Sequence, residues 1–351
     1  MDKAHYTDRV GLMHFDRLSC LRNEYAPNDC THCLDICPSE GFEFKQGKLR
    51  LSVSSCTQCG ACLGSCPTGA LSLYSFDMGK LEQRIAKEGE SILACKENLP
   101  CLGAFCSNDW ISVLLKAHKS FTCKLSFCYE CPLNSHGKLS HFIERSIDEA
   151  NRFVAILGEN LHISKAYEPE IQSDSRRAFL TRFVPSPEKE NTAIPLIAPL
   201  STPSLERIKK VLKPYVTEMK NTIIEEDFSF IHHKSIEQQS CTNCKECVQF
   251  CPTHALSCNS DGTKILFQIG KCINCGICED ICKPHSIFKA QKAIDLVAFA
   301  FDKAHVLIEH DLQVCLTCKC AFSYKGGVKI CERCGSFEQE HADMFTLASE
   351  L

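Results

Sequence analysis

The sequence has no uninterrupted apolar run of the roughly 18 residues that a membrane-spanning helix requires. Its best candidate, "AIPLIAPL" at residues 193–200, is broken by prolines. The first 20 residues also lack the apolar segment and the small-residue cleavage site of a secretory signal peptide. We therefore expect a cytoplasmic protein with no direct membrane insertion.

Basic residues are not in excess, because 39 lysines and arginines face 43 aspartates and glutamates, for a net charge of −4. A nucleic-acid-binding protein would show a basic surplus, so we expect no nucleic acid as a partner. The sequence also lacks a G-x-G-x-x-G or G-x4-G-K-[ST] fingerprint. Neither a dinucleotide fold nor a P-loop is indicated.

Cysteine, in contrast, is abundant, with 28 among 351 residues. Such a content would indicate disulfides in a short secreted chain. Thiols stay reduced in the cytosol, so in this longer chain the cysteines are better interpreted as ligands of metals or clusters.

The most specific pattern is C-x2-C-x2-C-x3-C, which occurs three times without interruption. A fourth copy is incomplete: Cys30, Cys33 and Cys37 precede Pro38, but Pro27 stands where the first cysteine belongs. This spacing lets a tight loop present three thiolates to one iron–sulfur cubane, while the fourth cysteine points away to the other cluster of a pair. The uninterrupted copies are Cys56, Cys59, Cys62 and Cys66; Cys241, Cys244, Cys247 and Cys251; and Cys272, Cys275, Cys278 and Cys282.

These motifs form an internal repeat, because residues 20–74 and 241–288 each hold two of them around a hairpin-like connector. In the first connector apolar and polar residues alternate around Gln46-Gly47. In the second they flank Asp261-Gly262, so both connectors are predicted to be β-hairpins.

At these motifs the chain resembles the bacterial 2[4Fe-4S] ferredoxin family, present twice. The resemblance covers roughly residues 15–75 and 238–290. It implies ferredoxin-like folds and four [4Fe-4S] clusters with crossed ligation. The implied sets are Cys37 with Cys56, Cys59 and Cys62; Cys282 with Cys241, Cys244 and Cys247; Cys251 with Cys272, Cys275 and Cys278; and an incomplete set of Cys30, Cys33 and Cys66.

Cys20 is our candidate for the missing ligand of the incomplete set, since it lies ten residues before Cys30. A loop of that length closes at modest entropic cost. The alternative is a [3Fe-4S] site with three ligands, in which Cys20 is a small buried hydrophobe. Zinc knuckles are an alternative for all these motifs, but zinc favours C-x2-C pairs separated by a long gap.

Cluster binding changes the charge of the protein. Sixteen thiolates and four oxidised cores of +2 each would bring the holo-protein to about −12. A redox partner that docks near a cluster should therefore present a basic face.

A different arrangement closes the chain: Cys315, Cys318, Cys331 and Cys334 follow C-x2-C-x12-C-x2-C. This is the spacing of tetrahedral zinc sites. It resembles a zinc ribbon and, more weakly, a rubredoxin, with a hairpin expected to turn at Gly326-Gly327. Cys320 is a spare that could replace Cys318. We predict one structural Zn²⁺, with iron as the alternative.

The segment between the repeats reads as a small α/β unit with a parallel strand pair. Strands are predicted at 91–95 and 121–128, with helices at 109–120 and 140–157. Strand ends of a parallel pair meet at one sheet edge, where sites form. The hypothesis is a site for zinc or a further cluster, and the alternative is unligated thiols. Its cysteines would be Cys95, Cys101, Cys128 and Cys131.

Together these patterns predict an α+β protein with five regions. Seven of the 14 prolines fall between Pro169 and Pro214, which indicates a connector with short helices at 176–183 and 204–215. The predicted regions are a ferredoxin-type module at 1–80, the α/β unit at 85–160, the connector at 161–237, a second ferredoxin-type module at 238–290 and a zinc-ribbon-like tail at 291–351.

The function implied by the resemblance is relay of single electrons. All cluster positions carry cysteine, so no iron is left open to a substrate, and we expect an electron carrier or subunit rather than a catalyst. Such a chain resembles the iron–sulfur subunits and polyferredoxins of larger oxidoreductases, such as formate dehydrogenases and hydrogenases. Two alternatives are a cluster-fed thiol/disulfide oxidoreductase acting in the middle domain and an iron–sulfur assembly or sensor protein.

Overall fold

The computed structural model describes residues 7–25, 28–74, 76–95, 97–134, 137–167 and 202–340. Most of its helices are shorter than ten residues, α4, α6 and α7 being longer, and its sheets have two or three strands each. The predicted helix at 176–183 lies outside the described residues. Within the described residues, no helix combines the length and apolar character needed to cross a membrane.

The first module is built from a small sheet and a hairpin. Strands β1 (Thr7–Val10), β2 (Met13–Asp16) and β5 (Leu71–Leu73) form an antiparallel sheet in the order β1-β2-β5. Strands β3 (Phe42–Lys45) and β4 (Lys48–Leu51) form the predicted hairpin. Gln46 and Gly47 have φ of 53° and 72°, as a tight two-residue turn requires. Helices α1 (Leu21–Glu24) and α2 (His32–Ile36) complete the module.

The middle domain contains a parallel sheet, as predicted. Strands β6 (Ile92–Ala94) and β7 (Phe121–Lys124) pair in parallel. A third strand, β8 (Ile163–Ala166), pairs in parallel with β7 and continues the sheet past residue 160, where the sequence indicated a connector. The strand predicted to reach Cys128 ends at Lys124. The helices are α3 (Met78–Gln83) with a π-helical turn at Arg84–Glu88, α4 (Ser107–Ala117), α5 (Ser126–Tyr129) and α6 (Lys138–Ile156), with 3-10 turns at Leu102–Ala104 and Pro132–Asn134.

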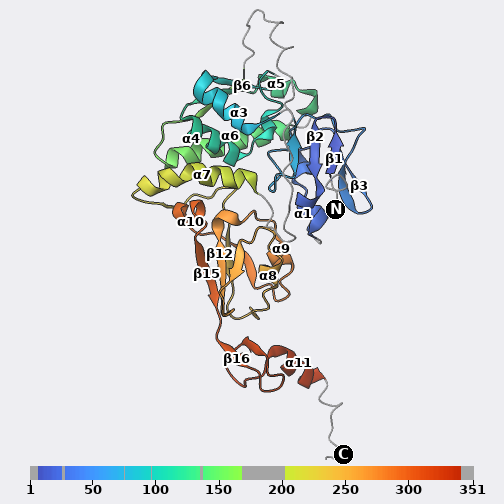
Figure 1. The fold of residues 1–351 in the computed structure, drawn as a ribbon, viewed down its shortest axis with the longest axis vertical. Helices are drawn as coiled ribbons and strands as arrows, with labels where there is room; N and C mark the ends of the chain where they lie inside the picture. The colour runs from blue at the N-terminus through green and yellow to red at the C-terminus, as the bar shows by residue number, and fades with distance from the viewer. Residues whose placement is uncertain are drawn as a thin grey trace, which may run out of the picture.

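Helix α7 (Pro203–Glu218) extends the helix predicted at 204–215 and joins the two halves of the protein. It contacts α4 of the middle domain and α10 (Leu296–Ala300) of the second half. Figure 1 shows α7 lying between these two regions. Ile208 and Leu212 are fully buried in this contact, and Lys209 pairs with Asp302 at 2.8 Å. This part of the predicted connector is thus a packed element of the core.

The second module repeats the plan of the first. Strands β10 (His233–Ile236) and β13 (Ile287–Ala290) pair, and β11 (Leu256–Cys258) and β12 (Lys264–Gln268) form the second predicted hairpin. Strand β15 (Ala304–Glu309) adds to β12, so the sheet continues beyond residue 290, where the sequence placed the tail. The remaining elements are α8 (Glu246–Gln249), α9 (Ile277–Asp280), the 3-10 turn Ile269–Lys271, and the pair β9 (Ile223–Ile224) and β14 (Ile294–Asp295).

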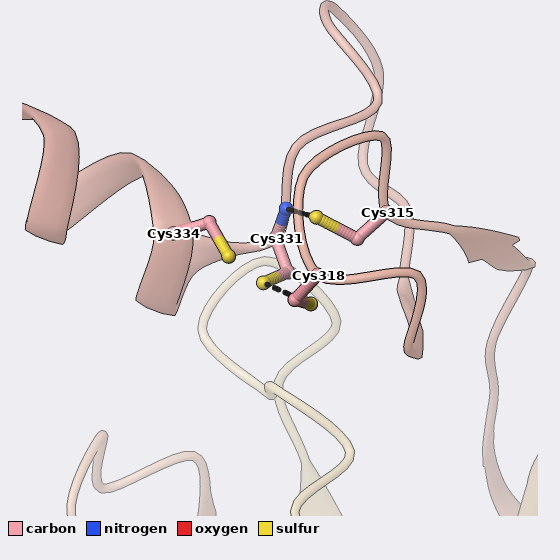
Figure 2. Close-up of side chains that lie close together, drawn as sticks. All are labelled: Cys315, Cys318, Cys331 and Cys334. Carbon is pink, nitrogen blue, oxygen red and sulfur yellow. Dashed lines mark hydrogen bonds between the residues drawn. The ribbon is translucent and has the colours of Figure 1, made fainter.

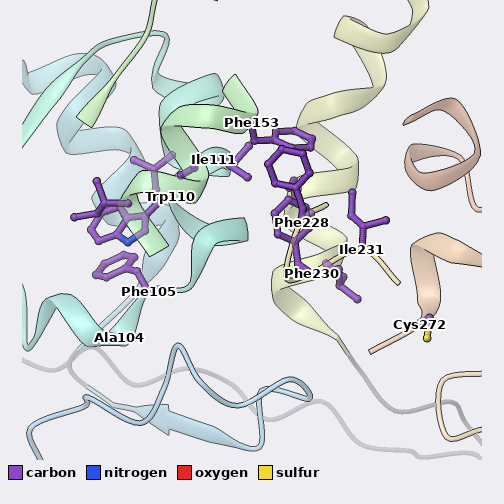
Figure 3. Packing of buried hydrophobic residues seen from close by; sticks show 14 of the residues in the cluster. Ala104, Phe105, Trp110, Ile111, Phe153, Phe228, Phe230, Ile231 and Cys272 are labelled. Atoms are coloured by element: carbon purple, nitrogen blue, oxygen red, sulfur yellow. The ribbon is translucent and has the colours of Figure 1, made fainter. Parts of the chain in front are cut away.

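A row of aromatic rings links the middle domain to the second module. Phe153 of α6 meets Phe228 and Phe230 with ring centroids 4.9 and 5.4 Å apart. Phe230 in turn lies 6.2 Å from Phe299 of α10. Figure 3 shows Phe153, Phe228 and Phe230 gathered beside Ile231. Each such ring pair contributes about 0.5–1.5 kcal/mol beyond its burial, so the two regions share one core.

The tail follows β15 as a separate extension of the chain (Figure 1). It contains β16 (Leu312–Val314), β17 (Ala321–Ser323) and α11 (Glu332–Glu340). The expected hairpin at Gly326-Gly327 is wrong: the paired strands are β16 and β17, and the chain between them carries the first knuckle. Gly326 and Gly327 lie in a loop, with φ of 103° and 82°. Within the described residues, no strand follows these glycines to pair with β17.

Candidate cluster and metal sites

The first candidate site is a cavity of about 280 Å³ in the first module. Four thiols line it, and they are one of the sets implied by the ferredoxin resemblance. Gly41 lies against the site, and its N–H donates a hydrogen bond to the sulfur of Cys37 at 3.1 Å. A Cβ on Gly41 would lie 3.1 Å from Cys56 Cα and 3.3 Å from Cys37 Sγ, so the glycine is needed for the close approach. The lining thiols are Cys37, Cys56, Cys59 and Cys62.

The second candidate site is the group of thiols around Cys20, the proposed substitute for a cysteine at position 27. Cys20 is buried at the start of α1, directly after the 3-10 turn Arg17–Ser19. Thr68 connects its neighbour to Cys66, because its hydroxyl donates to Ser19 O at 2.7 Å and lies 3.6 Å from Cys66 Sγ. The pKa of Cys20 is raised to about 11, mainly by burial, with smaller contributions from the thiols of Cys66 and Cys30 and with two backbone N–H groups acting in the opposite direction.

Cys33 completes this second group. The pKa of Cys33 is raised, mainly by burial, and the neighbouring thiols of Cys66, Cys30 and Cys20 add to this rise. Cys20 therefore lies among the three cysteines that the incomplete motif leaves together. The thiol of Cys33 also acts on Cys62, whose pKa is raised mainly by burial, so the two sites of the module adjoin.

The second module contains the matching pair of sites. A cavity of about 320 Å³ is lined by four thiols, and Ser286 N donates to one of them, Cys282 Sγ, at 3.2 Å. His310 Nε2 lies 3.6 Å from Cys241 Sγ, and its Nδ1 lies 2.7 Å from Ser323 Oγ of β17. The lining thiols are Cys241, Cys244, Cys247 and Cys282.

The other site of this module contains a buried positive charge. Lys234 is 1% exposed and pairs with Glu279, and its ammonium also reaches Asn274 Oδ1 at 3.2 Å. Burial raises the pKa of Cys278, and the charge of Lys234 opposes that rise. Four thiols here are electrostatic neighbours of one another: Cys251, Cys272, Cys275 and Cys278.

These four groups fit iron–sulfur clusters in their donor chemistry. Each brings four thiols together from two motifs, with Cys20 added from outside the motifs in the second group, and all the cysteines are free of disulfides. In two groups the thiols surround a cavity, and backbone N–H groups point at a sulfur. Thiolates are the form that binds iron, and N–H donors stabilise their charge.

The tail brings its four predicted ligands into a tighter group. The sulfur atoms of Cys315, Cys318, Cys331 and Cys334 all lie within 4.8 Å of one another (Figure 2). Cys318 and Cys331 are 3.8 Å apart, and a tetrahedral site with metal–sulfur bonds of about 2.3 Å requires sulfurs about 3.8 Å apart. The N–H of Cys331 donates to Cys315 Sγ and lowers the pKa of that thiol to about 6. The group can therefore hold one metal ion.

Eight cysteines lie outside these five groups. Four of them, Cys95, Cys101, Cys128 and Cys131, lie near one another at the edge of the middle-domain sheet. Cys106 is bound to Ser204 at 3.0 Å and to Asp109 at 3.3 Å, which gives it a structural role beside α7.

Two side chains beside the cysteine groups, Lys234 and His310, were not predicted from the sequence. Lys234 lies on a strand, β10, with its side chain buried. A lysine within a short strand is a weak signal of an inward charge, and its partner Glu279 is 45 residues away. His310 follows β15 and has no local motif.

Comparison with known proteins matches the two regions that carry the three uninterrupted cysteine motifs. Residues 233–283 match the family of 4Fe-4S dicluster domains, and residues 50–72 match the 4Fe-4S binding domain. An uncharacterized ferredoxin of Methanocaldococcus jannaschii is 41% identical over 44 residues, which are 12% of this chain and 71% of the relative.

Proposed function

Because the chain belongs to the family of 4Fe-4S ferredoxins, we propose that it relays single electrons through four [4Fe-4S] clusters. The proposed ligands are the four cysteine groups described above. We name the groups by position in the chain: site 1 is Cys37, Cys56, Cys59 and Cys62; site 2 is Cys20, Cys30, Cys33 and Cys66; site 3 is Cys251, Cys272, Cys275 and Cys278; and site 4 is Cys241, Cys244, Cys247 and Cys282.

A cluster bound at each site would accept and return one electron, which requires little rearrangement of the protein. The chain's own residues hold the thiolates in place and offset their charge. Gly41 N and Ser286 N do so at sites 1 and 4, and Lys234 does so at site 3. Some of these thiols are buried, but Cys244 of site 4 is exposed. Hydrogen bonds, nearby charge and solvent exposure together would set the potentials.

The observation that carries the proposal is a direct contact between the two modules. Asn28 Nδ2 donates to the carbonyl oxygen of Cys275 at 2.7 Å, and Asn28 Oδ1 accepts from the N–H of Cys30 at 3.2 Å. One side chain thus bridges a ligand residue of site 2 and a ligand residue of site 3. Tyr25 lies in the same contact. Its pKa is raised mainly by burial, and the thiols of Cys251 and Cys275, which belong to the second module, contribute to that rise.

With this contact, each proposed site has the next one as its neighbour, in the order 1, 2, 3 and 4. Sites 1 and 2 adjoin through Cys62 and Cys33, sites 2 and 3 through Asn28, and sites 3 and 4 share the second module. Two separate ferredoxins would each hold an isolated pair of clusters. A continuous line favours relay between two partners that dock at different places.

For a partner, we propose a catalytic subunit of a larger oxidoreductase of the formate dehydrogenase or hydrogenase type. With clusters bound, the protein would carry a charge of about −12. A basic docking face on the partner would complement that charge and speed association.

The decisive experiment is anaerobic purification of the full chain with iron and acid-labile sulfide quantified. We expect a brown protein with at least about 16 irons and as many sulfides per chain. Reduced protein should pass electrons to a one-electron acceptor dye. A colourless protein without acid-labile sulfide would contradict the proposal.

In the tail, we propose one structural Zn²⁺, because four thiolates leave no open position for chemistry. Cys331→Ser should remove about one zinc per chain and leave the iron content unchanged, as measured by elemental mass spectrometry. Cys320→Ser is the matched control and should keep the metal, because Cys320 is outside the tight group. Iron in place of zinc at this site would overturn the assignment.

A further inference from the structure

Four cysteines of the middle domain gather at the carboxyl edge of its parallel sheet. Cys95 directly follows β6, and Cys128 lies in α5, which follows the parallel strand β7. Cys101 and Cys131 come six and three residues later in the chain. The edge beyond the carboxyl ends of parallel strands is where α/β folds place their binding sites.

The thiols are connected to one another. The thiol of Cys95 donates to Pro100 O at 3.4 Å and is a hydrogen-bond partner of the Cys101 thiol. Cys128 in turn has both Cys95 and Cys131 as electrostatic neighbours. The four side chains therefore form one group, although they come from two loops about 30 residues apart.

The surrounding loops are fixed by hydrogen bonds. Gly103 N donates to Cys101 Sγ at 3.4 Å, which caps the turn Leu102–Ala104. Asn134 Nδ2 donates to Cys128 O at 2.9 Å, and Asn134 N donates to Cys131 O at 2.8 Å. Asn134 Oδ1 also accepts from Leu139 N, which ties this loop to the start of α6. Both cysteine loops are thus part of the rigid frame.

The spacing of the sulfurs indicates what the group can hold. Among the described residues, the tail cysteines alone form a group whose sulfurs all lie within 4.8 Å. The middle-domain group is more widely spaced, as are sites 1 to 4, so it is too open for one tetrahedral zinc ion. A cubane carries an iron at each of four corners and needs such wider spacing.

Site 1 lies directly beside this group. Pro100 packs on Gly60, where an added Cβ would lie 3.6 Å from Pro100 Cβ. Gly64 touches the backbone of Phe105 so closely that a Cβ there would lie 2.6 Å from the Phe105 carbonyl carbon. The thiol of Cys59, a site 1 ligand in our proposal, is among the charges that act on Cys101.

We propose that Cys95, Cys101, Cys128 and Cys131 bind a fifth [4Fe-4S] cluster, which extends the line of sites into the middle domain. The inference rests on the proposed function, because its electrons would come from site 1. One electron would leave site 1 as one arrives here, with no bond broken and no proton transferred. The line would then run from the middle domain through sites 1, 2, 3 and 4.

Burial argues for ligands rather than for a thiol that reacts with a disulfide substrate. Such a reaction needs an exposed thiol that ionises readily. Cys101 and Cys128 are only 5% and 6% exposed. The other two thiols, of Cys95 and Cys131, are half-buried. A cluster compensates the charge of the thiolates at all four positions, whereas an external disulfide has no access to Cys101 or Cys128.

The test compares the iron and sulfide content of anaerobically purified full-length protein and variants. We expect about 20 irons in the unaltered chain and about 16 in the double variant Cys101→Ala/Cys131→Ala, because two remaining thiolates cannot hold even a three-iron cluster. The EPR spectrum of reduced protein should show one spin fewer in that variant. Cys123→Ala, on strand β7 of the same domain, is the matched control and should retain about 20 irons.

The outcomes separate this inference from the proposed function. About 16 irons in both the unaltered chain and the double variant would overturn the fifth cluster and leave sites 1 to 4 in place. An additional zinc ion lost in the double variant would also overturn it. Absence of iron from the unaltered chain would overturn the proposed function as well. Because sites 1 to 4 lie in the same chain, their retained irons show that a variant has folded.

Discussion

Replacing Cys20 with alanine should convert the cluster of site 2 to a three-iron form. Cys20 is the only ligand of the proposed set that lies outside the C-x2-C-x2-C-x3-C spacing, and Thr68 ties its neighbour to Cys66. Without the fourth thiolate one iron corner has no protein ligand and is lost. We expect about one iron fewer per chain and a new EPR signal of about one spin in oxidised protein.

Two further variants make this prediction specific. Cys258→Ala removes a half-buried cysteine on β11 that belongs to none of the proposed sets, and its iron content should not change. Pro27→Cys restores the spacing of the missing first ligand, so adding it to Cys20→Ala should return the lost iron. An oxidised spectrum of Cys20→Ala identical to that of the unaltered protein would remove Cys20 from the site.

Replacing Lys234 with methionine should lower the reduction potential of site 3. Reduction adds a negative charge, and the buried ammonium of Lys234 favours the more negative state. Charges about 8 Å apart interact by about 2 kcal/mol at an effective permittivity of about 20. That energy corresponds to about 90 mV for one electron. Glu279 cancels part of it, so we expect a fall of roughly 50 mV in an EPR-monitored redox titration.

The partner of Lys234 provides a control of opposite sign. Glu279→Gln removes a negative charge beside the same site and should raise the potential. Lys289→Met changes an exposed lysine that pairs in register with Lys234 on the neighbouring strand, and it should have a much smaller effect. Midpoint potentials that stay the same in Lys234→Met and Glu279→Gln would refute an electrostatic role for this pair.

The cysteine groups were largely predictable because their spacing is itself a ligand geometry. Two-residue gaps bring three thiols to one loop wherever they occur, and the ferredoxin pattern supplies the crossed fourth ligand. The hairpins were equally local, since Gln46-Gly47 and Asp261-Gly262 carry turn chemistry in the sequence. The placement of Cys20 among Cys30, Cys33 and Cys66 agrees with the hypothesis made from loop length.

The features that sequence analysis did not find depend on distant partners. Strand β8 is four residues long and is defined by its pairing with β7. Helix α7 was predicted at 204–215, but nothing in that segment indicates that it packs against α4 and α10. The bridge from Asn28 to Cys275 joins residues 247 positions apart, so neither sequence segment indicates it.

Because of the shared aromatic core, we expect that the second module does not fold in isolation. Small ferredoxins are autonomous domains, but here Phe299 and Phe230 belong both to this module's surroundings and to the packing of α6. Cutting the module out would leave these rings in water and remove the support of α7 from α10. The second module therefore depends on α6 and α7 for part of its packing.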